Sequence, residues 1–285
     1  MTQAARTIEP IPAPPQPDLT ALKSKMKATW EDGDYASFAT YMEPGAIEIL
    51  EGWNIAPGQR LLDVGCGAGQ TALPAARRGL HVTGVDIAEN LVAHARKRAR
   101  AEGLVVRFDQ GDAEELPYAD ASFDVAVTLI GAMFAPCPER VAAEFARVIR
   151  PGGKLHMANW TPFGMPAMMF KCVAAYVPPP PGFIPPVLWG DEETVRQRLD
   201  SQFTDIRLTR KTYPQWHYSF TPAELVGFFR RYFGPVKRAF DVVDARAKQT
   251  LSQELENIYA ESSETLNGIL TVTKGEYLEV IATRR

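Results

Sequence analysis

The residues best suited to binding chemistry form a short glycine-rich stretch, residues 63–71, which reads Asp-Val-Gly-Cys-Gly-Ala-Gly-Gln-Thr. Apolar residues lead into it and an alanine-rich segment with a helical pattern follows, so the sequence predicts a strand, a tight turn and the start of a helix. Glycine tolerates positive φ and has no Cβ, and the first turn of a helix has unpaired N–H groups, so a ligand can approach the backbone closely. We therefore expect an anionic group of a ligand to bind at this turn.

The spacing of the glycines departs from the dinucleotide-binding pattern Gly-x-Gly-x-x-Gly. Gly65 and Gly67 fit this pattern, but Gln70 stands where the third glycine belongs. Asp63 precedes the turn, where its carboxylate attracts an ammonium group and repels a pyrophosphate. The pattern favours a ligand that carries an ammonium group over a dinucleotide, and NAD(P) binding by an oxidoreductase is the alternative.

Further acids follow the next predicted strands. Asp86 comes about twenty residues after Gly65, where a carboxylate can accept hydrogen bonds from both ribose hydroxyls; its alternative role is to cap the next helix. Asp112 opens the segment Asp-Ala-Glu-Glu-Leu-Pro, residues 112–117, and its alternative is a solvated turn. Because the carboxyl ends of parallel strands meet at one edge of a sheet, we expect both acids to lie near the glycine turn.

The glycine turn, followed by Val85-Asp86, resembles the nucleotide turn of class I S-adenosylmethionine-dependent methyltransferases, and among them the small-molecule, type 11 enzymes. Motifs in the same order extend the resemblance over residues 56–160, and topology alone extends it further. The resemblance implies S-adenosyl-L-methionine as the cofactor, with its methionine part on the turn, its ribose on the second strand and its adenine after the third. The implied cofactor contacts are Tyr35, Asp63, Gly65, Cys66, Gly67, Gln70, Asp86, Ile87, Asp112, Ala113 and Thr128.

Tyr35 enters this set because an aromatic residue ahead of the core can offer a ring face to a sulfonium and a hydroxyl as a donor. Trp30, on the preceding helical pattern, is expected to pack in the core. Residues 128–134, at the end of the fourth predicted strand, should line the pocket near the sulfonium. Within them Met133 is either a substrate contact or a core residue.

Methyl transfer needs little covalent chemistry from the protein, because the sulfonium is already a strong electrophile and the enzyme chiefly aligns the acceptor and excludes water. A general base is required only for an acceptor that holds its proton tightly. His217 is the best-placed candidate for such a base. The other imidazoles are expected on the second strand, the helix after it and inside the fifth strand, away from the pocket.

The segment from Trp160 to residue 189 is rich in methionine, aromatic residues and proline. Together with Phe229 it favours an apolar lid over a small, largely apolar or aromatic acceptor, and core packing is the alternative. Met133, Trp160 and Phe229 are the candidate substrate contacts.

The elements that must position these residues alternate in type along the chain. Strands are predicted at 61–64, 81–86, 105–108, 123–129, 154–159, 206–209 and 277–283. Helices are predicted at 70–78, 88–102, 138–149, 189–199, 222–232 and 245–260, with a long loop at 161–188 that holds at most one helix, near 167–176. This alternation predicts an α/β fold: a Rossmann-like, doubly wound sheet. The resemblance adds a seventh strand, the last, that inserts antiparallel, and a helical insertion before it.

We expect a proline-rich disordered leader at 1–18, a helical cap at 19–55 and a methyltransferase domain at 56–285 with lid segments near 161–190 and 219–265. The chain has 285 residues, of which 46% are hydrophobic, and a formal net charge of −3, so composition favours no nucleic-acid or membrane partner. The 3 cysteines show no metal-ligand spacing and fit a reducing cytoplasm. We expect no bound metal and a monomer or homodimer.

The main hypothesis is therefore S-adenosylmethionine-dependent methyl transfer to a small acceptor by in-line displacement. The alternatives are an NAD(P)-dependent oxidoreductase and a non-catalytic cofactor-binding protein. The sequence leaves the acceptor and the methylated atom open.

Overall fold

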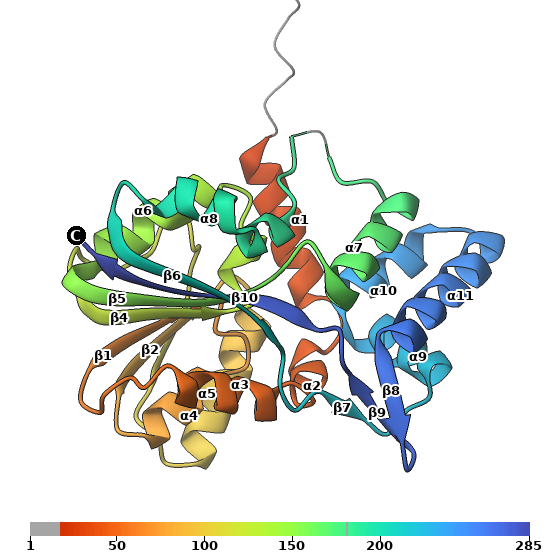
Figure 1. Ribbon diagram of the computed structural model, residues 1–285, viewed down its shortest axis with the longest axis horizontal. Coiled ribbons are helices and arrows are strands. Elements are labelled where there is room, and N and C mark those ends of the chain that lie inside the picture. Colours follow the sequence, from red (N-terminus) through yellow and green to blue (C-terminus); the bar gives the residue numbers. More distant parts are fainter. Residues whose placement is uncertain (1–17, 181) are drawn as a thin grey trace, which may run out of the picture.

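The computed structural model describes residues 18–180 and 182–285, so all of the predicted leader except Asp18 lies outside the described residues. A 7-stranded sheet forms the centre of the molecule, in the order β3-β2-β1-β4-β5-β10-β6 (Figure 1). Its strands are β1 (Arg60–Val64), β2 (His81–Asp86), β3 (Arg107–Gln110), β4 (Phe123–Leu129), β5 (Ile149–Trp160), β6 (Phe203–Thr212) and β10 (Glu276–Arg284).

The strand pairs of this sheet are parallel except for the two that involve β10. β1 pairs in parallel with β2 and β4, and β4 pairs in parallel with β5. β10 runs antiparallel to both of its neighbours, with Val280 opposite Met157 on β5 and Leu208 on β6. The predicted Rossmann-like sheet with an antiparallel last strand is confirmed.

Helices cover both faces of the sheet. In Figure 1, α3, α4 and α5 lie on one face, and α6 and α8 lie on the other. Their bounds are α3 (Glu43–Gly52), α4 (Ala72–Arg77), α5 (Glu89–Ala101), α6 (Pro138–Val148) and α8 (Glu192–Leu199). The apolar residues Val141, Phe145 and Val148 share one face of α6 and are buried, which explains why this segment forms an amphipathic helix against the sheet.

Two helices precede α3 and complete the predicted helical cap. They are α1 (Leu19–Glu31) and α2 (Tyr35–Ala39). The side chain of Asp18 accepts backbone N–H bonds at the start of α1, and the side chain of Asp34 does so at the start of α2. The Asp18 cap fixes where α1 begins, and the Asp34 cap fixes where the chain turns from α1 into α2.

The helical insertion lies beyond the carboxyl ends of the parallel strands (Figure 1). It contains α7 (Gly164–Tyr176), the 3-10 helix η2 (Pro186–Gly190), α9 (Pro222–Tyr232), α10 (Gly234–Val242) and α11 (Ala245–Glu261). α9 begins at Thr221 with the capping box that the sequence predicts. Among the described helices, none is long and apolar enough to cross a bilayer.

Three features of this region differ from the prediction. α7 extends to residues 164–176 because Met165 and Met169, one turn apart, are buried against the core, so 161–188 is less of a loop than predicted. α10 is not predicted. A small sheet, β7-β9-β8, is not predicted either; its strands are β7 (His217–Tyr218), β8 (Ser263–Leu266) and β9 (Ile269–Val272). β8 is largely polar and exposed, which hides it from a search for apolar alternation.

Candidate cofactor and acceptor site

The glycine turn joins β1 to α4 and rests on the end of β2. Its glycines, Gly65, Gly67 and Gly69, have φ of 73°, 52° and 92°, a region that glycine adopts without strain. The N–H groups of Gly65 and Cys66 both donate to the carbonyl oxygen of Val85, at 2.8 and 3.1 Å. A Cβ on Gly65 would lie 2.6 Å from Cα of Gly131, so the turn also packs tightly against the end of β4. The turn is therefore held on two sides.

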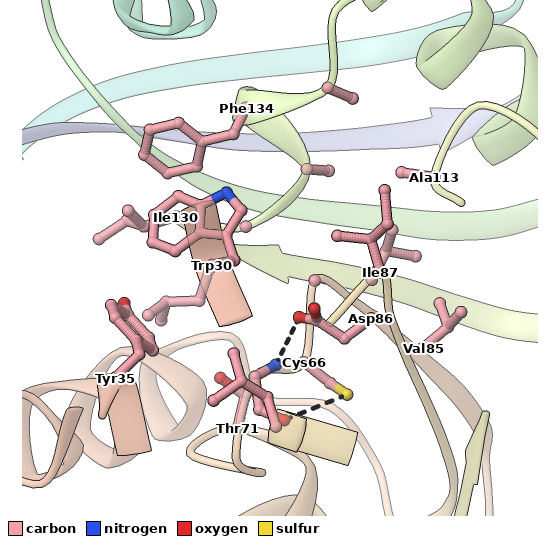
Figure 2. A pocket seen from close by; sticks show the side chains of 18 of the residues that line it. Trp30, Tyr35, Cys66, Thr71, Val85, Asp86, Ile87, Ala113, Ile130 and Phe134 are labelled. Atoms are coloured by element: carbon pink, nitrogen blue, oxygen red, sulfur yellow. Dashed lines mark hydrogen bonds between the residues drawn. The ribbon is translucent and has the colours of Figure 1, made fainter. Parts of the chain in front are cut away.

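A cavity of about 1070 Å³, its solvent-filled mouth included, opens above this turn. Figure 2 shows Trp30 and Tyr35 on one side of it and Asp86 and Ile87 on the other. The predicted cofactor contacts that line it are Tyr35, Gly65, Cys66, Gly67, Gln70, Asp86, Ile87, Asp112 and Ala113. Residues far apart in the sequence thus meet at the carboxyl edge of the sheet.

Asp63 and Thr128 lie directly behind the cavity wall rather than in it. Asp63 is 1% exposed, and its Oδ2 has no hydrogen-bond partner among the described residues. Burial and the nearby charge of Asp86 raise the pKa of Asp63 to about 7, although the Ala72 N–H bond acts in the opposite direction. Thr128 is fully buried, and its hydroxyl accepts the Ala132 N–H at 2.9 Å. Thr128 therefore shapes the turn after β4.

Two buried polar atoms next to the glycine turn lack a hydrogen-bond partner among the described residues: Oδ2 of Asp63 and Nε2 of Gln70. A carboxylate oxygen accepts hydrogen bonds and a side-chain amide nitrogen donates them. Buried polar atoms without partners carry a free-energy cost that a ligand can remove. An ammonium and a carboxylate, the two charged groups of an amino acid, have the donor and acceptor character that matches these atoms, so the side chains beside the glycine turn fit the methionine part of S-adenosylmethionine.

Asp86 already has two backbone partners. Its Oδ2 accepts the Gly67 N–H at 2.9 Å (Figure 2), and its Oδ1 accepts the Ala88 N–H at 2.9 Å. Asp86 thus ties the glycine turn to the start of α5, and the helix-capping alternative holds in part. Each carboxylate oxygen keeps a second lone pair that can accept a ribose hydroxyl. Burial is the largest influence on the Asp86 carboxyl and raises its pKa, whereas the backbone bonds oppose this.

Asp112 lies at the other end of the cavity and is bound to helix α1. Its Oδ2 lies 2.6 Å from Nζ of Lys23, and its Oδ1 accepts the Glu114 N–H at 2.9 Å. The same ammonium lies 2.6 Å from Oε2 of Glu114, a side chain that is fully buried. Lys23 lines the cavity, so α1 closes over this end of it.

A second cavity, of about 370 Å³ with its solvent-filled mouth included, adjoins the first. The two share Trp30, Tyr35, Met42, Ile130 and Phe134. The remaining residues of the second cavity are apolar or aromatic: Phe38, Trp160, Met165, Pro166, Met169, Phe170, Trp216, Phe229 and Phe233. The side chains of α1, α2, α7 and α9 therefore build a pocket of aromatic faces beside the cofactor cavity.

Aromatic contacts fix the junction between the cavities. The ring of Trp30 meets the rings of Tyr35 and Phe134 edge to face, with centroids 5.4 and 4.9 Å apart. Burial, and to a smaller extent the charge of Asp86, raises the pKa of the Tyr35 hydroxyl. Tyr35 is therefore a neutral hydrogen-bond donor at the junction.

The predicted general base, His217, and the predicted substrate contact Met133 lie outside both cavities. His217 is exposed on β7, where its Nδ1 lies 2.9 Å from Oγ1 of Thr271, and it lines neither cavity. Met133 is 1% exposed and lines neither cavity, so the structure places it in the core. The predicted substrate contacts Trp160 and Phe229 both line the second cavity.

Trp30 and Lys23 are among the lining residues that were not identified as site residues from the sequence. Trp30, expected in the core, lines both cavities, and Lys23 lines the first. Their spacing held a signal: Lys23, Met26 and Trp30 follow at i, i+3 and i+7, which places them on one face of a helix. A lysine on the apolar face of a helix indicates that this face meets an acidic site.

Comparison with known proteins agrees with this geometry. Residues 62–157 match the family model described as a methyltransferase domain. An uncharacterized protein of Mycobacterium tuberculosis is 36% identical over 213 residues, which cover 74% of this chain and 77% of that protein. The methyltransferase GfsG of Streptomyces halstedii is 42% identical over 115 residues, 39% of this chain and 41% of that protein.

A solved structure, phosphoethanolamine N-methyltransferase 2 of Haemonchus contortus in complex with S-adenosyl-L-methionine, has the same fold. Its TM-score is 0.53 at 21% identity, and the match covers 84% of this chain and 52% of that one. The chain belongs to the class I S-adenosylmethionine-dependent methyltransferases.

Proposed function

We propose that the protein transfers a methyl group from S-adenosyl-L-methionine to a small, largely apolar or aromatic acceptor by in-line displacement. The observation that carries this proposal is the pair of adjoining cavities. One is lined by acids and by the glycine turn, and the other by aromatic and apolar side chains, and the two meet at Trp30, Tyr35 and Phe134.

The first cavity accounts for each part of the cofactor. Asp63, from behind the cavity wall, would accept from the ammonium of the methionine part, and Gln70, which lines the cavity, would donate to its carboxylate, because each side chain has a buried polar atom without a hydrogen-bond partner among the described residues. Asp86 would accept from the ribose hydroxyls. Asp112 and Ala113 would flank the adenine, at the end that α1 covers.

When bound, the cofactor supplies a methyl group on a positively charged sulfur. The residues of the junction would orient the acceptor toward it: Trp30, Tyr35 and Phe134 line both cavities, and the face of an aromatic ring also attracts a positive charge. The same rings exclude water from the space between the two cavities. We therefore expect the protein to speed methyl transfer mainly by aligning the acceptor and by excluding water.

The acceptor class follows from the second cavity. Among the described residues that line it, none has a side chain charged at neutral pH, and the Tyr35 hydroxyl is one of its few polar groups. A charged acceptor would lose its hydration there without gaining a counter-ion. An uncharged, apolar or aromatic body of modest size is favoured by the burial of its surface.

The cofactor assignment is tested by titration calorimetry with S-adenosylhomocysteine. We expect micromolar binding to the intact protein and no measurable binding to Asp86→Ala. Gln70→Leu keeps the size of the side chain and the Asp86 bonds, and should weaken binding about tenfold because one hydrogen bond to a charged group is lost. Asp120→Ala, a surface change, is the control. Equal affinity in all four proteins would contradict the assignment.

The acceptor assignment is tested with S-adenosylmethionine labelled in its methyl group. We expect label to pass to apolar aromatic compounds and into an organic extract, and Phe229→Trp, which fills the second cavity, should abolish this while leaving S-adenosylhomocysteine affinity within twofold. Transfer only to charged, water-soluble acceptors would contradict the apolar class.

A further inference from the structure

Helix α1 carries one cation to the acidic end of the cofactor cavity. Nζ of Lys23 lies 2.6 Å from Oδ2 of Asp112 and 2.6 Å from Oε2 of Glu114. Both acids lie in the segment after β3, far from α1 in the sequence. This ammonium therefore joins the first described helix to the adenine end of the site.

Glu114 makes this contact energetically important. Its side chain is fully buried in the ion pair, while the side chain of Lys23 is 21% exposed. Oε1 of Glu114 accepts the Cys137 N–H at 2.7 Å, but Lys23 is the cation that faces its other oxygen. A buried carboxylate that loses its partner is strongly destabilising. Lifting α1 away from the sheet would leave Glu114 in that state, so the ion pair favours the closed position.

The other end of α1 is held by different contacts. The Glu89 N–H donates to Oε1 of Glu31 at 3.2 Å, and Nη2 of Arg238 donates to the carbonyl oxygen of Ala28 at 2.9 Å. Between the two ends, Trp30 lines both cavities. α1 thus extends from the adenine end to the junction, with Lys23 as its attachment at the adenine end.

We propose that Lys23 is a positioning residue that fastens α1 over the bound cofactor, and that exchange of S-adenosylhomocysteine for S-adenosylmethionine requires the Lys23 ion pairs to break. This inference rests on the proposed function, because it takes the occupant of the cavity to be this cofactor. Retention of the cofactor is then set by an ion pair that does not touch the methionine part.

The test measures the dissociation rate of S-adenosylhomocysteine from the full chain. Stopped flow follows the release through intrinsic tryptophan fluorescence, to which Trp30 in the cavity contributes. We expect Lys23→Met to raise this rate about tenfold or more, since removing one partner of a desolvated charge pair acts mainly on dissociation. Lys23→Arg should restore a rate within threefold of the unmodified protein. Lys25→Met, an exposed lysine of the same helix without an ion pair among the described residues, is the matched control and should leave the rate unchanged.

A second measurement uses the unmodified protein and does not depend on how the variants fold. Hydrogen exchange of the backbone amides of residues 19–31 should slow at least tenfold when S-adenosylhomocysteine is bound. The inference fails if the cofactor binds but α1 exchanges equally fast with and without it, or if Lys23→Met releases it as slowly as Lys25→Met does. Absence of any binding to the unmodified protein would instead overturn the proposed function, and this inference with it.

Discussion

At the scale of single residues, Asp63 is the group that we expect to make cofactor binding depend on pH. Burial and the charge of Asp86 raise its pKa to about 7. Below that pH the carboxyl is mostly neutral and attracts an ammonium weakly, and above it the carboxylate is charged. Because binding of an ammonium favours the charged form, the ligand lowers this pKa and releases a proton when it binds below pH 7.

We therefore expect S-adenosylhomocysteine to bind about tenfold more tightly at pH 8 than at pH 5.5, the change that corresponds to about one unit of ligand-induced pKa shift. Calorimetry in two buffers of different ionisation enthalpy measures the affinity and the released proton together. Asp63→Asn, which cannot ionise, should remove the pH dependence. If it persists unchanged in that variant, Asp63 is not the group responsible.

The residues of the site divide into those that local sequence predicts and those that only packing reveals. Asp63, Gly65 and Asp86 are predictable because a strand, a turn and a helix in succession fix their place at the sheet edge. Lys23 and Trp30 are not, because their role depends on where α1 docks against distant segments. His217 lies on a strand of the small sheet, β7, that pairs with residues more than fifty positions later, and no local pattern indicates this.

At the scale of elements, the backbone segments that follow β1 and β4 approach each other closely. A Cβ on Gly131 would lie 2.6 Å from the carbonyl oxygen of Gly65 and 2.8 Å from its Cα. We expect Gly131→Ala to lower the free energy of unfolding by about 1–3 kcal/mol, because backbone atoms must move apart. The displaced glycine turn should also bind S-adenosylhomocysteine at least tenfold more weakly.

Urea unfolding and calorimetry measure these two effects. Gly52→Ala is the control, since a Cβ there meets nothing within 4 Å and Gly52 lies in α3. That change should stabilise the protein slightly or leave it unchanged, because alanine favours a helix over glycine. Normal stability and normal binding in Gly131→Ala would show that β1 and β4 can separate without consequence.

The elements themselves are predictable to different degrees. The core strands and helices can be predicted from the spacing of their apolar residues and from their capping residues. At Thr221, for example, the capping box coincides with the start of α9. The hairpin of β8 and β9 and the helix α10 escape prediction because β8 is largely polar and α10 follows α9 after a single residue. Their structure depends on contacts with the rest of the insertion rather than on local pattern.

At the scale of the whole molecule, the cofactor cavity lies between the sheet and the helices α1 and α2, so a ligand there links the two parts. Saturating S-adenosylhomocysteine, at about one hundred times its dissociation constant, should add about 2.7 kcal/mol to the free energy of unfolding. For a chain of this size that raises the melting temperature by about 5 °C or more. Differential scanning calorimetry measures it.

NADH at the same concentration is the control and should cause no shift, because Gln70 replaces the third glycine of the dinucleotide pattern and Asp63 opposes a pyrophosphate. A larger shift with NADH than with S-adenosylhomocysteine would contradict the cofactor assignment.

The position of β10 has a consequence for biosynthesis. This strand comes after every other strand along the chain, yet it lies between β5 and β6 and buries Leu278, Val280 and Ala282. While a ribosome is still translating the segment before it, β6 has no neighbour in the sheet and β5 presents a bare edge. The nascent chain must keep both strands from pairing with other chains until residues 276–284 emerge, so the sheet closes only after all of its other strands have been made.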